Sequence, residues 1–184
     1  MNTIKGAINH YYNKPRDKKR EIGHYHASEI WYIYKGYTTP GNFFKQKEAD
    51  KQGQANMFRG SAMEDMLCKI LEEEKAPFVT QKRLEIKIDD FIISGKTDFE
   101  FEDLIVETKC PDKPIYEIPD KWKFQMECYH RATGKQVYLG VFYKDGDEII
   151  RFFKYEPSDE TWELIQNTIK NFHLKMLIKW IYIN

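Results

Sequence analysis

Two carboxylates and a lysine fall on one face of a short β-hairpin between residues 93 and 109. Apolar residues alternate along both arms, and a two-residue turn at 102–103 would join them. In that register Asp98 lies opposite Glu107, and Lys109 projects from the same face because side chains alternate along a strand. Opposed carboxylates repel at the roughly 5 Å that separates facing Cβ atoms. The hairpin therefore predicts a cation site.

Composition excludes several other kinds of protein. Lys+Arg and Asp+Glu both number 29 in the 184 residues, so the net charge indicates no class of partner. The three cysteines, Cys68, Cys110 and Cys128, form no C-x-x-C pair, which argues against zinc or iron–sulfur sites and against a secreted disulfide framework. No apolar run approaches the ~18 residues of a membrane span. We therefore expect a cytoplasmic protein with no membrane partner.

Hydrophobic periodicity predicts an α/β (α+β) fold, with a mixed central sheet flanked by helices. The expected helices cover about 57–75, 120–133 with a stop at Gly134, and 158 to the end; the expected strands cover about 83–93, the 98–109 hairpin, 136–143 and 148–155. Asp145-Gly146 should join the last two strands as a hairpin turn. Residues 40–56 indicate a loop or a marginal helix. We assign residues 1–56 as a basic and aromatic segment of the same domain, and 57–184 as its core with the C-terminal helix.

Two further polar groups lie on helices that flank the hairpin. Glu64 borders the apolar stripe of the first helix, where its carboxylate could face the sheet or could simply be a surface glutamate. Gln125 and Tyr129 are four residues apart and share a helix face, so they could offer an amide and a phenol to one ligand.

The N-terminal region combines basic and aromatic residues. Lys18, Lys19 and Arg20 close a basic run, and His26 and Ser28 open an aromatic-rich segment. Such a region could bind phosphates and stack bases. The alternative is a basic tail that leads into a buried aromatic helix.

Four short motifs in order resemble a known superfamily. Gly-x-x-x-Glu at 60–64, Gly-x-x-Asp at 95–98, Glu-x-Lys at 107–109 and Gln-x-x-x-Tyr at 125–129 resemble the PD-(D/E)XK nucleases. Within that superfamily the chain is similar to the RecB-type nucleases, including the CRISPR-associated RecB-like exonucleases, and to lambda exonuclease. The resemblance spans about 57–145. It implies a restriction-endonuclease-like fold with an αβββαβ core and a metal-dependent phosphodiesterase site.

The motifs also depart from the pattern. Glu64 stands where the RecB branch often has His, and a Glu at this position is more similar to lambda exonuclease. Thr97 replaces the Pro of the superfamily name. The cysteines that hold an iron–sulfur cluster in many CRISPR-associated members have no counterparts. We therefore expect no such cluster, and the branch stays open.

The residue chemistry predicts a Mg²⁺ or Mn²⁺ site. Asp98 and Glu107 are hard oxygen ligands, the Thr108 carbonyl could add another, and Glu64 could join directly or through water. A bound metal would lower the pKa of a water molecule and neutralise charge in the transition state. Lys109 would orient or help deprotonate that water. By resemblance, Gln125 and Tyr129 would position the lysine and the scissile phosphate.

We therefore expect a metal-dependent DNA nuclease, exonuclease or endonuclease, that acts on single strands or ends. DNA repair, recombination and viral or CRISPR-related DNA processing are the settings that such an activity would suit. Two alternatives remain open: a catalytically inactive DNA- or partner-binding module of the same fold, and a junction-specific endonuclease. The apolar C-terminal helix, which ends in Ile178-Lys-Trp180-Ile-Tyr-Ile183, is either core or the interface of a homo-oligomer.

Overall fold

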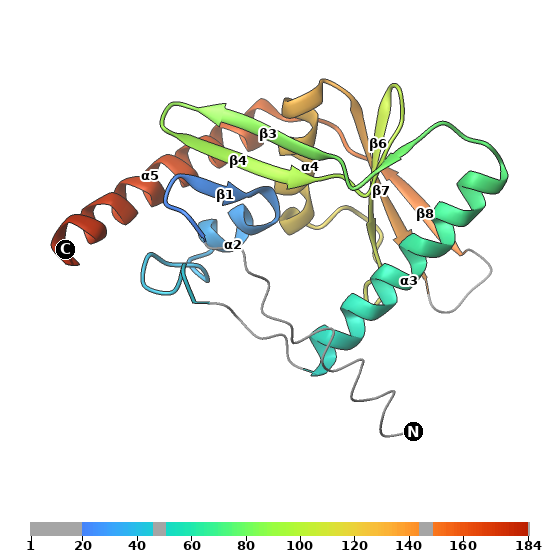
Figure 1. Cartoon of the computed structure of the whole chain (residues 1–184), viewed down its shortest axis with the longest axis horizontal. Helices are drawn as coiled ribbons and strands as arrows, with labels where there is room; N and C mark the ends of the chain where they lie inside the picture. Colours follow the sequence, from blue (N-terminus) through green and yellow to red (C-terminus); the bar gives the residue numbers. More distant parts are fainter. Residues whose placement is uncertain (1–19, 46–50, 144–148, 184) are drawn as a thin grey trace.

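The computed structural model describes residues 20–45, 51–143 and 149–183, and its elements are shown in Figure 1. They are, in chain order, β1 His24–His26, the 3-10 turn η1 Ala27–Glu29, α2 Ile30–Tyr34, α3 Lys51–Glu73, β2 Val79–Thr80, β3 Arg83–Ile88, β4 Phe91–Lys96, β5 Phe99–Glu100, β6 Leu104–Lys109, α4 Asp120–Thr133, β7 Gln136–Phe142, β8 Ile150–Lys154 and α5 Asp159–Ile183. Lys18 and Lys19 and the expected Asp145-Gly146 turn lie outside the described residues.

The strands form two sheets that share one long hairpin. A five-stranded sheet has the order β2-β5-β6-β7-β8, and a three-stranded sheet has the order β1-β4-β3. The chain passes from β4 to β5 through Thr97 and Asp98, where Thr97 N–H donates to the Lys82 carbonyl at 3.0 Å and Gln81 N–H to the Asp98 carbonyl at 3.4 Å. One arm of this hairpin is therefore β2 followed by β3, and the other is β4 followed by β5. Each arm has one strand in each sheet. The mixed sheet and the αβββαβ order agree with the predicted fold class.

The hairpin of residues 98–109 forms in the expected register. Phe99 pairs with Val106, and the Phe101 N–H donates to the Leu104 carbonyl at 2.8 Å across the turn at 102–103. The strand β6 then pairs in parallel with β7, which places β6 in the interior of the five-stranded sheet. The carboxylates and the lysine therefore stand on a strand that is paired on both sides.

One expected strand is wrong. The segment 83–93 is not continuous, because the chain reverses at Asp89-Asp90 and pairs Ile88 with Phe91. Asp89 has φ +47°, a left-handed conformation that Asp tolerates better than most residues. The two adjacent aspartates interrupt the apolar alternation between Ile88 and Phe91, a turn signal that the expected continuous strand overlooked.

The helix α3 starts earlier than the expected residue 57, and its apolar stripe is only partly covered. Met66 and Ile70 are 38% and 47% exposed. Figure 1 shows α3 beside the five-stranded sheet, on the side of the molecule away from α5. This helix, which carries Glu64, therefore has little core of its own.

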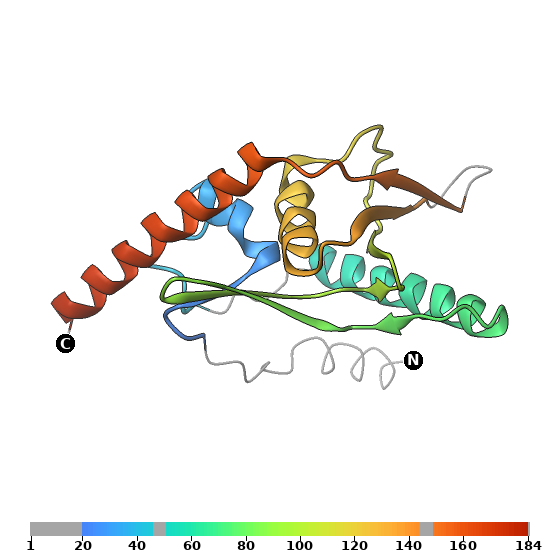
Figure 2. The same cartoon turned by 90° about the horizontal axis from the view of Figure 1, so that it is seen from above.

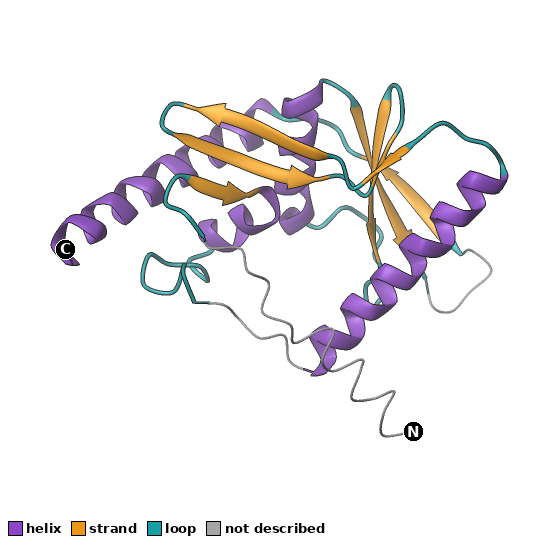
Figure 3. Ribbon diagram, viewed as in Figure 1, coloured by secondary structure: helices purple, strands orange, loops and turns teal. Residues whose placement is uncertain are grey.

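The core gathers around α4, which lies between the two sheets (Figures 2 and 3). It ends as predicted at Gly134, whose φ of +71° forms a left-handed cap. The helix α5 packs on α4 and α2 through Ile165, Ile169, Phe172 and Met176, whereas Trp180 and Ile181 are exposed. None of the described helices has the length and apolar character needed to cross a bilayer.

A buried carboxylate joins α4 to the start of α5. Glu127, which is 0% exposed, accepts hydrogen bonds from Arg131 Nε at 2.7 Å, the Tyr155 hydroxyl at 2.6 Å and the Ser158 N–H at 3.0 Å. Arg131 also pairs with the exposed Asp159 at 2.6 Å. Breaking a buried, hydrogen-bonded pair costs far more free energy than breaking an exposed one.

We expect Glu127→Ala to lower the free energy of unfolding by about 3 kcal/mol or more, because it leaves the buried Tyr155 hydroxyl and the part-buried Arg131 and Ser158 donors without this acceptor. Asp159→Ala, which removes the exposed partner of the same arginine, should cost about 1 kcal/mol or less. Urea unfolding of the two variants makes the comparison. Equal losses would contradict this account of the junction.

Candidate active site

Four separate parts of the chain bring the predicted residues to one place. Glu64 comes from α3, Asp98 from the bend between β4 and β5, and Glu107, Thr108 and Lys109 from β6; Gln125 and Tyr129 come from one face of α4. The bend positions Asp98, because there the shared hairpin leaves one sheet and enters the other. Neither the bend nor the approach of α4 can be read from local sequence patterns.

The carboxylate of Glu107 is the buried centre of the cluster. It is 2% exposed, and its Oε1 accepts a hydrogen bond from Gln125 Nε2 at 2.8 Å and an ion-pair contact from Lys109 Nζ. Its Oε2 is buried and has no hydrogen-bond partner. A buried anionic oxygen without a donor is costly, so this atom is suited to an added ligand.

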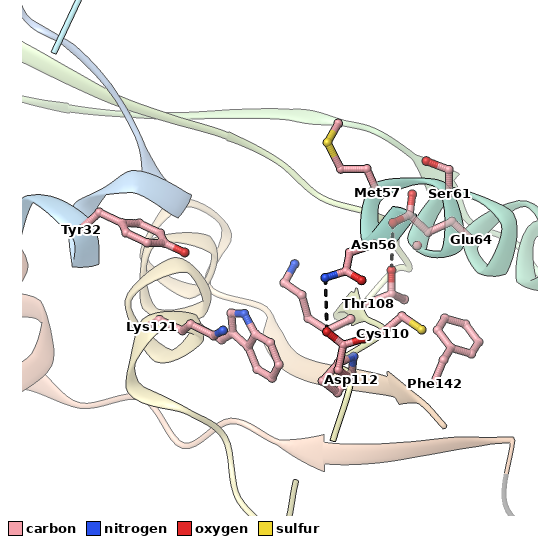
Figure 4. A pocket seen from close by; sticks show the side chains of 14 residues that line it. Tyr32, Asn56, Met57, Ser61, Glu64, Thr108, Cys110, Asp112, Lys121 and Phe142 are labelled. Carbon is pink, nitrogen blue, oxygen red and sulfur yellow. Dashed lines mark hydrogen bonds between the residues drawn. The ribbon is translucent and has the colours of Figure 1, made fainter. Parts of the chain in front are cut away.

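Thr108 links the other two carboxylates. Its backbone N–H donates to Asp98 Oδ2 at 2.7 Å. Its hydroxyl oxygen lies 2.8 Å from the same Asp98 oxygen and 3.4 Å from Glu64 Oε1. The hydroxyl and amide of Thr108 therefore place Asp98 beside Glu64, a contact that Figure 4 shows for Glu64 and Thr108.

Tyr129 fixes α4 against the bend. Its hydroxyl donates to the Lys96 carbonyl at 2.6 Å and lies 2.7 Å from Gln125 Nε2, which the geometry makes the donor. Its ring covers Gly95, where a Cβ would stand 2.6 Å from Tyr129 Cε1. The glycine of the 95–98 motif is therefore required by this close approach.

The electrostatic environment favours added positive charge. Burial, with the neighbouring Asp98, raises the pKa of Glu64 to about 7. Burial also raises the pKa of Glu107 to about 7, a rise that Lys109 opposes and Asp98 strengthens. Burial alone would lower the pKa of Lys109, but Glu107 and the other carboxylates outweigh it, so that pKa lies above its usual range. The Lys109 ammonium thus offsets the negative charge of three carboxylates, Glu107, Asp98 and Glu64.

The cluster has hard oxygen donors, although they are not gathered into a ready metal site. Among residues 20–45, 51–143 and 149–183, no group of three or more His, Cys, Asp or Glu side chains has an arrangement that holds a metal ion. Lys109 and Thr108 instead contact the oxygens that a metal would take. The unpartnered Glu107 Oε2 and the raised carboxyl pKa values nevertheless fit a hard divalent cation.

A pocket of about 670 Å³ opens onto this cluster (Figure 4). Glu64, Thr108 and Lys109 line one part of it, and Tyr32, Lys121 and Trp122 line another. A bridge from α3 to the loop after β6 forms a rim, because Arg59 pairs with Asp112 at 2.9 Å and Asn56 Nδ2 donates to Asp112 at 3.4 Å.

Among the described residues, the other predicted DNA-binding side chains, Arg20, His26 and Ser28, do not line this pocket. Arg20 pairs with Glu29 and donates to the Phe43 carbonyl at 2.9 Å, so it stabilises the N-terminal segment. His26 Nδ1 lies 3.2 Å from Ser94 Oγ on the three-stranded sheet, and Ser28 is exposed on η1. Their predicted contact with DNA stays a prediction.

Sequence reasoning missed Tyr32, Lys121 and Trp122 as pocket residues. Tyr32 belongs to the aromatic segment that the sequence did single out, but nothing local connects it to α4. The contact between α2 and α4 in the folded chain supplies that connection.

Comparison with solved structures shows the fold of known exonucleases. The crystal structure of the alkaline exonuclease of Laribacter hongkongensis matches with a TM-score of 0.64 at 15% identity, over 88% of this chain and 92% of that chain. The same enzyme in complex with dAMP gives a TM-score of 0.65 at 15% identity, with the same coverage. The protein SSO0001 gives 0.63 at 15% identity, over 91% of this chain and 85% of that chain. No family model matches the sequence, and no curated protein does.

We expect Gly95→Ala to lower the free energy of unfolding by about 1–3 kcal/mol, because the new methyl overlaps the Tyr129 ring. If that contact is the cause, adding Tyr129→Ala removes the overlap, and the double-mutant cycle gives a coupling of about 0.5–3 kcal/mol. Chemical denaturation of the four proteins measures it. Additive effects would contradict the contact.

Gly60→Ala is the matched control. Gly60 lies in α3 with nothing within 4 Å of the added Cβ. Its replacement should raise the free energy of unfolding by about 0.5–1 kcal/mol through helix propensity.

Proposed function

We propose that the chain is a metal-dependent DNA nuclease that hydrolyses phosphodiester bonds on single strands or at DNA ends. The observation that carries the proposal is the buried Glu107, with one unpartnered oxygen, in a cluster with Asp98 and Glu64. Of these three carboxylates, Glu64 lines the open pocket, together with Thr108 and Lys109. The fold that the chain shares with an alkaline exonuclease supports the same activity. The complex of that enzyme with dAMP supports a nucleotide as the ligand.

A second buried glutamate shows why the environment of Glu107 is unusual. Glu100 also has a buried Oε2 without a partner, but Lys82 and Lys135 contact its Oε1 at 2.7 and 2.8 Å. Burial raises the pKa of Glu100, yet the two lysines outweigh burial and leave it below the usual value. Glu107 shares one lysine with two other carboxylates. Glu107, unlike Glu100, therefore needs a further cation.

Asp98, Glu107 and Glu64 are the residues that would hold Mg²⁺ or Mn²⁺, with the Thr108 carbonyl as a further donor. When bound, the metal supplies an activated water and neutralises charge on the phosphate. Asp98 would then exchange part of its contact with Thr108 for the metal, whereas Glu107 would offer its unpartnered Oε2. Glu64 lies on the less tightly packed α3, so it can adjust its distance to the other two.

The other residues orient the reacting groups. Lys109 presents its ammonium beside Glu107, where it can hold the attacking water and stabilise negative charge that develops on the phosphate. Gln125 donates to Glu107 at 2.8 Å and so fixes the rotamer of that carboxylate. Tyr129 holds Gln125 in place at 2.7 Å. Gln125 and Tyr129 are therefore positioning residues in this mechanism.

We expect Glu107→Gln to reduce Mn²⁺-dependent cleavage of end-labelled DNA at least about hundredfold, because the amide removes a charged ligand from the metal. The same variant should be as stable as the parent or more stable, since burial disfavours the charged carboxylate there. Cleavage is followed on gels, and stability by thermal melting without metal.

The matched control is Glu100→Gln, which changes an equally buried glutamate. It should lower the free energy of unfolding by about 1–3 kcal/mol because Lys82 and Lys135 lose their acceptor. Its cleavage rate below the melting temperature should stay within about twofold of the parent. A catalytic loss equal to that of Glu107→Gln would contradict the assignment of the site.

We expect Lys109→Ala to abolish cleavage while the folded chain still binds Mn²⁺, because the lysine acts on the water and phosphate. Titration calorimetry with Mn²⁺ measures the binding, and the cleavage assay measures the reaction. Full activity in this variant would rule out the mechanism. An inactive DNA-binding module predicts retention of DNA by the parent chain with no heat from Mn²⁺ and no cleavage.

A further inference from the structure

The pocket extends from the carboxylates to a set of aromatic and basic side chains. In Figure 4, Glu64 and Ser61 lie on one side, and Tyr32 and Lys121 on the other. All four line the same pocket of about 670 Å³, together with Trp122. This volume is in the range of sites that enclose a small organic ligand. The metal proposal explains only the first of these two sides.

Tyr32 presents a ring that its neighbours hold in place. It is 42% exposed, and its centroid lies 5.2 Å from that of Trp31 in a perpendicular contact and 6.4 Å from that of Tyr37. An exposed ring fixed by aromatic neighbours is suited to stacking, because little side-chain entropy is lost when a flat ligand binds.

Lys121 presents a positive charge to the same part of the pocket as Tyr32. Its Nζ lies 4.8 Å from the centre of the Trp122 ring, and the indole is partly buried against the core. No carboxylate of the described residues pairs with Lys121, whereas the neighbouring Lys123 pairs with Asp120 at 3.0 Å. Trp122 therefore holds the ammonium by a cation–π contact without neutralising it.

We infer that Tyr32, Lys121 and Trp122 form a nucleotide subsite for single-stranded DNA next to the metal end of the pocket. Tyr32 stacks on a base, Lys121 binds the phosphate of that nucleotide, and Trp122 positions Lys121. A base inside a duplex has its faces covered by its neighbours, so stacking here requires an unpaired nucleotide. The inference rests on the proposed nuclease function, and it specifies the state of the strand at the cut.

Binding of a fluorescein-labelled oligothymidylate of about twelve nucleotides tests the subsite without cleavage. The full chain is titrated by fluorescence anisotropy in Ca²⁺, after a check that no product forms. We expect Tyr32→Ala to weaken binding about five- to hundredfold, since stacking contributes that much per base. Tyr32→Phe, which keeps the ring, should bind within about twofold of the parent.

Tyr34→Ala is the matched control. Tyr34 lies on the same helix with nearly the same exposure, 43%, but it packs against Phe124 and does not line the pocket. It should leave binding within about twofold of the parent. Equal losses in the Tyr32 and Tyr34 variants would overturn the inference, and so would an absence of single-strand binding by the parent.

Lys121 has its own readout and control. Affinity for a single strand falls with salt, and Lys121→Ala should make the slope of log affinity against log salt less steep by about 0.7, the share of one phosphate contact. Lys123→Ala should leave the slope unchanged. Trp122→Leu should give part of the same decrease, and Trp122→Phe should restore the slope. An unchanged slope in Lys121→Ala would overturn the phosphate assignment.

The outcomes separate this inference from the proposed function. If DNA is cut but Tyr32→Ala binds single strands normally, the subsite is wrong and the nuclease stands. If the parent chain cuts no DNA, but Tyr32→Ala weakens single-strand binding and Tyr34→Ala does not, the nuclease proposal is wrong and the subsite stands. If Tyr32→Ala weakened binding to a blunt duplex of matched length as much as binding to the single strand, the preference for an unpaired strand would be contradicted.

Discussion

The contact between Tyr129 and the bend of the shared hairpin holds the whole site together. The tyrosine ring lies on Gly95, its hydroxyl donates to the Lys96 carbonyl, and its neighbour Gln125 contacts Glu107. Because α4 lies between the two sheets, this one contact fixes the position of the bend relative to β6. The approach of Asp98 to Thr108 depends on that position.

The carboxylate cluster shows how the fold accepts an unfavourable arrangement at one place. Glu127 and Glu100 are buried with donors or lysines around them, and both are accounted for by structural hydrogen bonds. Glu107 is equally buried and, like Glu100, has an unpartnered oxygen, but it has one lysine instead of two and lies near two other carboxylates. Residues selected for stability alone would not be left in that state. The contrast supports the role proposed for Glu107, whereas Glu100 and Glu127 have structural partners.

The parts of this fold that the sequence predicted are those with local causes. The 98–109 hairpin follows from alternation and a two-residue turn, and the end of α4 follows from Gly134. The Asp89-Asp90 turn was missed because neither residue is Gly or Pro and apolar residues resume directly at Phe91, although the two aspartates interrupt the alternation. Tyr32 and Lys121 were missed because a tertiary contact joins them. Motif order predicted which site residues meet, but their hydrogen bonds depend on the bend and on α4.

The elements of the site also differ in how firmly the fold holds them. Glu107 stands on a strand paired on both sides, and Gln125 stands on the central helix, so both have one position. Glu64 belongs to α3, whose apolar residues are partly exposed and whose start is tied to the loop after β6 by Arg59 and Asp112. That tie forms a rim of the pocket. Glu64 lines the pocket beside that rim, so under the proposed function a ligand between the rim and Tyr32 would contact the carboxylate that stands on the least enclosed of these elements.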